Sequence, residues 1–365
     1  MFIDITDGLL QKLPLVKNYY LHHAGKLKRD VCLLLHRWNL LKPYTFVEWL
    51  ATYECNICCP FCEASAGKAA ENELTTHEAI ALIDDLANMG IKRLVISGGE
   101  PLVRRDLMDI MHYGNKKGLR FGLVTNSYLV DTLWDRLKQF DYFLYFTSID
   151  GLPEYHDGMR KRGSFGKAME ALDLFAALGV RTRIINTVLH SDNIGQLEEL
   201  YRLVTSSAAN RWHIAPIANV GRCDDRSKYG LDGRILKNIV SFIRHHHHQD
   251  LAIDLAEACS YLGYFDGQPV GKPFFCGAGL TRCSVMPDGE VVGCHTIYDN
   301  RWSEGNIRDK AFSQIWKQNF SRFRENRRLY DSCRDCIYLK KCRGGCWSEM
   351  ELHNACLKSV WEKST

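Results

Sequence analysis

The sequence has no apolar run of the about 18 residues that a transmembrane helix requires, and its first residues show no signal-peptide pattern. It has little net charge, +4 over 365 residues, which argues against general binding to nucleic acid. Cysteine, by contrast, is abundant, with 15 residues. Because no secretion signal accompanies them, we expect a cytoplasmic protein whose thiols bind metal rather than form disulfides.

Strand-like and helix-like segments alternate between residues 46 and 220. The expected strands are 46–50, 92–97, 121–125, 142–149, 181–189 and 212–215, and the expected helices are 77–89, 106–117, 129–140, 165–178 and 194–204. This alternation predicts an α/β fold built from βα units around a parallel sheet. Where such βα units close into a barrel, functional sites lie at the carboxyl ends of the strands.

The rest of the chain divides by composition. Residues 1–45 have helical spacing and are predicted to form an N-terminal helical extension ahead of the main domain, 46–220. Residues 221–269 are expected to be a connecting region with a helix. Residues 270–365 hold eight of the fifteen cysteines, which is typical of a small domain stabilised by metal.

Cys55, Cys59 and Cys62 follow the first expected strand in a CxxxCxxC spacing. Three thiolates on one loop can hold three corners of a [4Fe–4S] cluster and leave one iron open, whereas a cluster that only carries electrons normally has four cysteine ligands. The alternative is zinc, because Cys55–Cys58 and Cys59–Cys62 are also two CxxC pairs. These pairs are contiguous, and four thiolates from eight residues would strain tetrahedral geometry.

The cysteine loop and the Ser97-Gly98-Gly99-Glu100-Pro101 segment after the second expected strand together resemble the signature of the radical S-adenosylmethionine (SAM) superfamily. The resemblance implies a (β/α)6 partial TIM barrel and a [4Fe–4S] cluster whose open iron binds SAM. Reduction would then cleave SAM to a 5′-deoxyadenosyl radical. The glycines would let the backbone approach the ligand, and the Glu100 carboxylate would accept a hydrogen bond from the methionyl amine.

Other residues match the same family singly, and the resemblance implies that they contact SAM or substrate: Phe61, Asn126, Ser148, Asp150 and Arg160. Two of them have an ordinary alternative. Phe61 could simply pack within its loop, and Arg160 could form a surface ion pair of little energetic value. Ser127 stands where glycine is common in the family, which leaves the conformation of that turn open.

The C-terminal cysteines form a second pattern, similar to the seven-cysteine SPASM pattern of auxiliary-cluster domains. The resemblance implies two auxiliary [4Fe–4S] clusters, and thus three clusters in all. The first would be held by Cys276, Cys294 and Cys346, and the second by Cys333, Cys336, Cys342 and Cys356. Cys283 is the candidate for the missing ligand of the first cluster; without it, that iron would be open. A single zinc on four of these thiols is the alternative, and it would leave Cys276, Cys294 and Cys356 unexplained.

His295 directly follows Cys294. The related anaerobic sulfatase maturases have at that position an acidic residue that takes the substrate proton. A histidine there could serve as a base near neutral pH, or it could form a structural hydrogen bond to a cluster ligand.

The resemblance therefore implies an enzyme that abstracts hydrogen from an unactivated C–H bond of a peptide, leading to oxidation, crosslinking or epimerisation. The alternative is the same chemistry on a small molecule, such as an aminocyclitol, a sugar or a tetrapyrrole side chain. A third class, an electron carrier, is disfavoured because a carrier gains nothing from an open iron. An external one-electron donor of the flavodoxin or ferredoxin type is implied. The 45 residues before the barrel are few for a fused leader-binding module, which weakens the case for a peptide without removing it, since a separate peptide-binding protein can supply that module.

Overall fold

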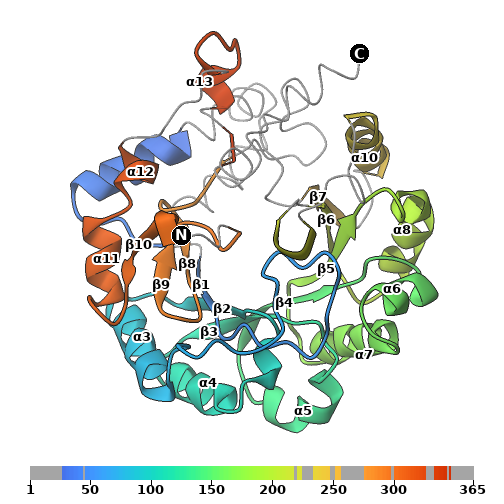
Figure 1. Ribbon diagram of the computed structural model, residues 1–365, viewed down its shortest axis with the longest axis horizontal. Helices are drawn as coiled ribbons and strands as arrows, with labels where there is room; N and C mark the ends of the chain where they lie inside the picture. Colours follow the sequence, from blue (N-terminus) through green and yellow to red (C-terminus); the bar gives the residue numbers. More distant parts are fainter. Residues whose placement is uncertain are drawn as a thin grey trace.

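Parallel strands and covering helices alternate through most of the chain. The computed structural model describes residues 27–43, 46–217, 220–223, 233–246, 251–255, 275–296, 300–325, 333–342, 345 and 346. Within these residues the strands form one ten-stranded sheet in the order β10-β9-β8-β1-β2-β3-β4-β5-β6-β7. Figure 1 shows the parallel strands curved into an arch with the helices on its outer side, so the predicted partial barrel is confirmed.

The parallel part of the sheet consists of β1 (Phe46–Leu50), β2 (Arg93–Ser97), β3 (Arg120–Val124), β4 (Tyr142–Ser148), β5 (Arg183–Leu189), β6 (Arg211–Pro216) and β7 (Ala252–Leu255). The helices that cover it are α3 (Thr76–Asn88), α4 (Leu107–Lys116), α5 (Val130–Leu137), α6 (Pro153–Met159), α7 (Ser164–Ala177), α8 (Leu197–Ser206) and α10 (Gly233–His246). Short 3-10 turns occur at η1 (Pro101–Val103), η2 (Ile194–Gln196) and η3 (Gly221–Cys223). Each strand expected from the sequence is present, with bounds that differ by at most two residues.

Between β1 and β7, one helix and one strand were not expected. Helix α6 lies between β4 and α7, and β7 extends the parallel sheet beside β6. The segment 221–269, which was expected to be connecting and helical, therefore also supplies a strand. Residues 27–37, within the segment 1–45, are helical.

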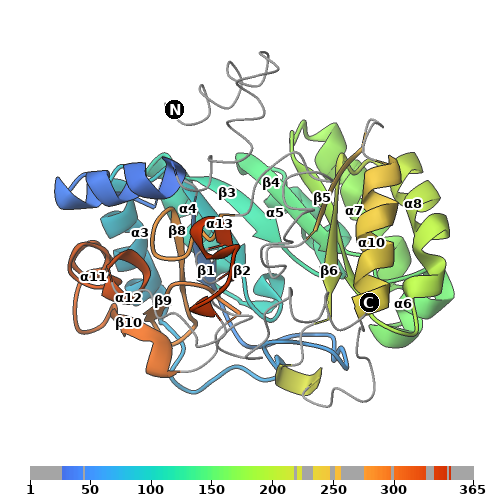
Figure 2. The ribbon, with the colours of Figure 1, turned by 90° about the horizontal axis from the view of Figure 1, so that it is seen from above.

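The C-terminal segment continues the same sheet. It contains β8 (Arg282–Val285), β9 (Glu290–Val292), β10 (Ser303–Asn306), η5 (Asn300–Trp302), α11 (Phe312–Gln318), α12 (Ser321–Arg324) and α13 (Leu339–Cys342). Strand β8 pairs in parallel with β1, with Glu48 opposite Ser284, and β9 and β10 follow antiparallel. In Figure 2 these strands lie with α11 and α12 at the β1 end of the sheet, and α8 and α10 lie at the other end.

The core lies between the sheet and the helices. Alternation along β1 places the fully buried side chains of Val47 and Trp49 in this core, whereas Glu48 points to the opposite face, the inside of the arch. Phe121 and Phe175 are also fully buried there. In the part of the chain that the structure describes, no helix combines the length and apolarity that crossing a membrane would need.

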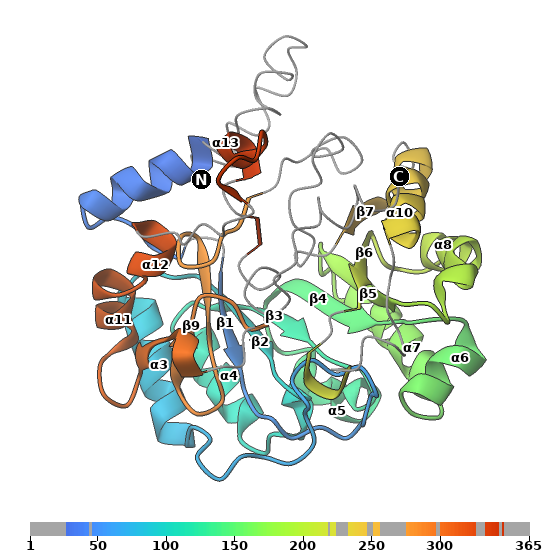
Figure 3. The same ribbon diagram turned by 45° about the horizontal axis from the view of Figure 1, so that its top comes forward.

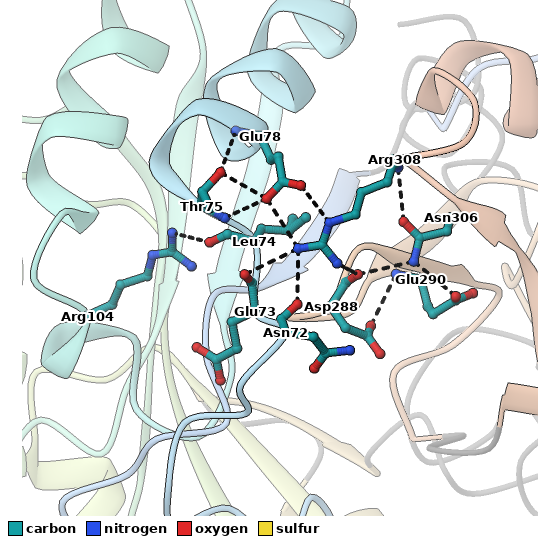
Figure 4. A network of polar contacts seen from close by, with 10 residues as sticks. All are labelled: Asn72, Glu73, Leu74, Thr75, Glu78, Arg104, Asp288, Glu290, Asn306 and Arg308. Carbon is teal, nitrogen blue, oxygen red and sulfur yellow. Dashed lines mark hydrogen bonds and ion pairs between the residues drawn. The ribbon is translucent and has the colours of Figure 1, made fainter.

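Polar contacts join the C-terminal hairpin to the start of α3 (Figure 4). Thr75 and Glu78 form a capping box at the N-terminus of α3, and Arg308 binds both oxygens of Glu78 at 2.5 and 3.2 Å. The Arg308 guanidinium also donates to the carbonyl oxygens of Asn72, Glu73 and Asp288. Arg308 therefore connects the turn between β8 and β9 to the segment that links the cysteine loop to α3.

We expect Arg308→Ala to lower the free energy of unfolding by about 1–2 kcal/mol, because several hydrogen bonds are lost from a partly exposed site. Arg308→Lys is the matched control: it keeps the charge but not the planar fork, so it should recover only part of the loss. Chemical unfolding of the three proteins measures this. Equal stability of wild type and Arg308→Ala would show that the network does not hold the hairpin.

Candidate functional site at the carboxyl ends of the strands

The loop after β1 carries the three cysteines of the CxxxCxxC pattern. It is closed at its base by hydrogen bonds from Cys55 N to Gly67 O, at 3.0 Å, and from Gly67 N to Tyr53 O, at 2.9 Å. Cys55, Cys59 and Cys62 are half-buried, while Cys58 is exposed. Burial raises the pKa of the Cys55 thiol to about 11, and the neighbouring thiols of Cys59 and Cys62 add to that rise. The three thiols therefore lie within electrostatic reach of one another.

The donor set of this loop suits an iron–sulfur cluster. Among the described residues, no three His, Cys, Asp or Glu side chains are grouped closely enough to hold a single metal ion. In a cubane cluster each cysteine binds a different iron, so the cysteine ligands lie apart around the cluster. They do not converge on one point, as the ligands of a single zinc ion must. Three spaced thiols on one closed loop fit the cluster better than they fit zinc.

The segment after β2 packs directly on this loop. Gly98, at φ 141°, and Gly99 lie against the backbone of residues 52–54, and a Cβ at either would come within 2.5 Å of a carbonyl oxygen there. We expected these glycines to give room for a ligand. The structure shows that their bare faces are used for close packing against the chain that leads into the cysteine loop.

Glu100 is fully buried and joins the ends of β2 and β3. Its Oε1 accepts hydrogen bonds from Thr125 Oγ1 and Leu102 N, and its Oε2 accepts one from Asn126 N at 2.7 Å. Burial raises the pKa of Glu100 to about 7, although these hydrogen bonds oppose the rise. A carboxylate has about four acceptor positions, so one remains on Oε2. Pro101 follows as the first residue of η1, capped by Glu100.

The turn after β3 brings an amide next to the cysteine loop. Asn126 Nδ2 donates to Asn56 Oδ1 at 2.8 Å and lies 3.8 Å from Cys55 Sγ. Ser127 adopts the left-handed conformation, with φ 67°, that glycine favours. Its buried hydroxyl contacts the hydroxyls of Tyr145 and Thr147, at 2.5 and 2.6 Å. These contacts explain how serine can occupy a position where glycine is common.

Asp150 and Arg160 form a buried ion pair beyond the end of β4. Asp150 Oδ2 is paired with Arg160 Nε, and Asp150 Oδ1 accepts a hydrogen bond from Val188 N at 3.0 Å. The guanidinium carbon of Arg160 lies 5.6 Å from the ring centroid of Phe61. Arg160 is therefore not a surface residue, and it lies on the same side of the site as the cysteine loop. Ser148, the last residue of β4, is half-buried.

His156 holds this corner as a neutral ring. It is 1% exposed, and its Nδ1 accepts a hydrogen bond from Asp150 N at 3.1 Å. Burial lowers the pKa of His156 to about 4.

The unfolded chain therefore takes up a proton on His156 near its ordinary pKa, while the folded protein does not. Stability should fall as the pH drops below about 6.5, by roughly 1 kcal/mol between about pH 7.5 and 5.5. Chemical unfolding of wild type and His156→Asn at both pH values measures this. If the stability of His156→Asn depends on pH as strongly as that of wild type, His156 does not contribute to this dependence.

His295 lies over β1 from the C-terminal segment. Its Nδ1 is 2.6 Å from Glu48 Oε2, and Glu48 also accepts hydrogen bonds from Ser97 at 2.7 Å and Ser284 at 3.4 Å. Burial opposes the charge on each side chain, but the attraction between the two charges outweighs burial. This attraction raises the pKa of His295 to about 10 and holds the pKa of Glu48 below its usual range. The paired state is an imidazolium, which can donate a proton but has no lone pair to accept one.

The cysteines predicted to hold the auxiliary clusters are only partly within the described residues. Cys276, Cys294, Cys336 and Cys342 are half-buried, Cys333 and Cys346 are buried, and Cys356 lies outside the described residues. Cys283 is 1% exposed within the hydrophobic core, on the face of β8 opposite to Ser284. Burial raises the pKa of the Cys283 thiol, and this setting is that of a core residue more than of a cluster ligand.

The sequence analysis missed two residues near the site. Glu48 interrupts the apolar strand Phe46-Val47-Glu48-Trp49-Leu50, and a lone charge in a central strand is a signal that could have been used. Arg222 donates hydrogen bonds to the carbonyl oxygens of Cys59 and Ala66. No local pattern marks Arg222, because its partners lie more than 150 positions away.

The comparisons with known proteins agree with this geometry. A model of the radical SAM superfamily matches residues 49–204, and a model of an iron–sulfur cluster-binding domain matches residues 276–337. Mycofactocin maturase MftC of Mycobacterium tuberculosis is 30% identical over 319 residues, covering 82% of this chain and 77% of that protein. The AdoMet-dependent heme synthase of Oleidesulfovibrio alaskensis is 27% identical over 322 residues, covering 82% and 81%.

Solved structures are similar over most of the chain. Streptococcus suis SuiB bound to S-adenosylmethionine gives a TM-score of 0.69 at 18% identity, covering 93% of this chain and 79% of SuiB. SuiB bound to its precursor peptide SuiA gives 0.68 at 16% identity, covering 90% and 77%. At this level of identity the similarity establishes the fold alone.

Proposed function

Because this chain belongs to the radical SAM superfamily and carries an iron–sulfur cluster-binding SPASM domain, we propose that it is a maturase that oxidises, crosslinks or epimerises a peptide. The observation that carries the radical chemistry is the closed loop with Cys55, Cys59 and Cys62 at the carboxyl ends of the strands. The choice of a peptide rests on the relative named as a maturase, which is 30% identical to this chain.

Cys55, Cys59 and Cys62 would hold the [4Fe–4S] cluster that, with SAM, supplies a 5′-deoxyadenosyl radical when bound. The protein's own contribution is orientation and exclusion of water. Asn126 is placed beside Cys55, and Glu100 holds the backbone of Asn126 in position. The proposed SAM-binding site also includes Gly98, Gly99, Pro101, Ser148, Phe61, Asp150 and Arg160, and in it Arg160 is paired with Asp150 and lies beside the ring of Phe61.

The alternative is a tetrapyrrole side chain, favoured by the relative named as a heme synthase at 27% identity. Both substrates require hydrogen abstraction from a C–H bond, so the SAM site does not separate them. An external one-electron donor of the flavodoxin or ferredoxin type is proposed for either substrate. A separate peptide-binding protein is proposed for a peptide only.

The sequence predicted His295 as a base, but its pair with Glu48 keeps the ring protonated, so we propose that it donates a proton to the substrate instead. Its Nδ1 is bound to Glu48, so Nε2 is the ring nitrogen left to meet a substrate. We further propose two auxiliary [4Fe–4S] clusters, one held by Cys276, Cys294 and Cys346, the other by Cys333, Cys336, Cys342 and Cys356.

Anaerobic reconstitution tests this proposal. The enzyme should form 5′-deoxyadenosine when dithionite and SAM are added. Incubation with candidate precursor peptides, and separately with porphyrin precursors of heme, should then give a mass change in one class only. Fully loaded protein that does not cleave SAM would refute the radical SAM activity, whereas a mass change only in the porphyrin would refute the peptide substrate.

Iron content tests the cluster assignment. Three clusters predict about twelve iron and twelve sulfide per chain, and replacing Cys55, Cys59 and Cys62 together should reduce this to about eight. If Cys283 is a core residue, as its burial supports, Cys283→Ser should keep the iron of wild type. Loss of auxiliary-cluster iron in Cys283→Ser would instead make it a ligand, and tightly bound zinc with only four irons would refute the SPASM assignment.

A further inference from the structure

The chain after β6 returns to the cysteine loop. The short turn η3, at residues 221–223, lies against the loop that follows β1 (Figure 3). Gly221 has a φ of +64°, and a Cβ at this position would lie 2.3 Å from the carbonyl oxygens of both Cys62 and Glu63. Only glycine allows the two backbones to approach this closely. The turn and the loop are therefore packed main chain to main chain.

Arg222 ties the two segments together. Its Nε donates to Cys59 O and its Nη1 to Ala66 O, both at 2.6 Å, and its backbone N donates to Cys62 O at 3.1 Å. These carbonyls lie along the second half of the loop, which contains two of the three ligand cysteines. Hydrogen bonds from an ionised donor are about twice as strong as neutral ones, and the planar guanidinium fixes their directions.

Apolar contacts act at the same place. Phe61, Ile217 and Cys223 form a small buried cluster, against which the half-buried Cys59 packs. Residues on both sides of Arg222 therefore also hold the loop. The contact is two-sided: apolar packing around Phe61 and hydrogen bonds to the carbonyls.

The charge of Arg222 lies beside a ligand residue. Its Nε is 2.6 Å from the carbonyl oxygen of Cys59, and the guanidinium carbon of Arg160 lies 5.6 Å from the ring centroid of Phe61 in the same loop. Arg160 is neutralised by Asp150 in a buried ion pair, whereas the contacts of the Arg222 side chain named above are all to carbonyl oxygens. Arg222 therefore places a positive charge next to a cluster ligand. A fixed positive charge favours the more negative, reduced state of a nearby cluster.

We propose that Arg222 is a positioning residue that holds the cysteine loop in its ligating shape and makes the cluster bound there easier to reduce. The inference rests on the proposed function only for the presence of the SAM-binding cluster. It is independent of the substrate.

The first test is iron release from the reconstituted enzyme to a ferrous-iron chelator. In Arg222→Gln, about four of the twelve irons should be released roughly tenfold faster than in wild type, because two charge-assisted hydrogen bonds to the loop are lost. Arg222→Lys should also release them faster, because it cannot span both carbonyls. Arg136→Gln, an exposed arginine in α5, is the control and should behave as wild type.

The second test separates charge from packing. The reduction potential of the EPR component that changes on adding SAM should become more negative in Arg222→Gln and stay near wild type in Arg222→Lys. About eight irons retained in the auxiliary clusters would show that a variant is folded. The proposal would be overturned if Arg222→Gln had the iron-release rate and the reduction potential of wild type. It would also be overturned if the reduction potential shifted from wild type by the same amount in Arg222→Gln and Arg222→Lys. Failure of the proposed function would appear in wild type instead, as the absence of SAM-dependent signal and of 5′-deoxyadenosine.

Discussion

Replacing Cys55, Cys59 or Cys62 by alanine should abolish reductive SAM cleavage, whereas Cys58→Ala should leave it nearly intact. The four thiols lie within eight residues, but Cys58 is exposed while the other three are half-buried in the closed loop. Losing one of three protein ligands leaves the cluster with too few to be held. Dithionite-driven formation of 5′-deoxyadenosine measures the effect.

Cys58→Ala is the matched control, since it removes a thiol from the same loop. If Cys58→Ala abolished cleavage and Cys59→Ala did not, the ligand register would be wrong. Zinc content should be measured in parallel, because retention of zinc by a loop with all four thiols would restore the paired-CxxC alternative.

The second large effect is expected at His295. His295→Ala should still bind and cleave SAM but lose product by about a hundred- to ten-thousand-fold, the usual range for loss of a proton-transfer group. 5′-Deoxyadenosine should continue to form without product. The ratio of product to 5′-deoxyadenosine, measured with the substrate found by mass spectrometry, reports this uncoupling.

Glu48→Gln accompanies this test because it keeps an oxygen near His295 Nδ1 and removes the charge. Its product ratio should fall between those of wild type and His295→Ala. His245→Ala, at an exposed position of α10, is the control. A loss of product below tenfold in His295→Ala would make the histidine structural. Tyr298 and Asp299 would then be the next candidates, and both lie outside the described residues.

The regular elements of the barrel could be predicted because their signals are local. Helix α7 was expected at 165–178 and is Ser164–Ala177, and β3 was expected at 121–125 and is Arg120–Val124. Apolar periodicity within ten to fifteen residues decides such elements. Strands β7 and β8 are only four residues long, and their pairing depends on partners elsewhere in the chain. No local pattern predicted that β8 would pair in parallel with β1.

The candidate site divides in the same way. The cysteine spacing and the Gly98-Gly99-Glu100-Pro101 segment were visible in the sequence, since metal ligands on one loop and glycine turns are short-range features. The use of those glycines was not visible: they pack against residues 52–54. Likewise, Arg160 could be proposed as a SAM contact, but only the fold showed that it is paired with buried Asp150.

The sequence by itself determined the family and the fold of this protein. Ligand number and spacing on one loop predict a cluster with an open iron, and the order of strands and helices predicts the partial barrel around it. Only the tertiary structure decided what surrounds that loop. Arg222 meets Cys59 across 163 positions, and Ser284 meets Glu48 across 236. Contacts at such separations depend on how the whole sheet closes, because burial and strand pairing, not local propensity, bring their partners together.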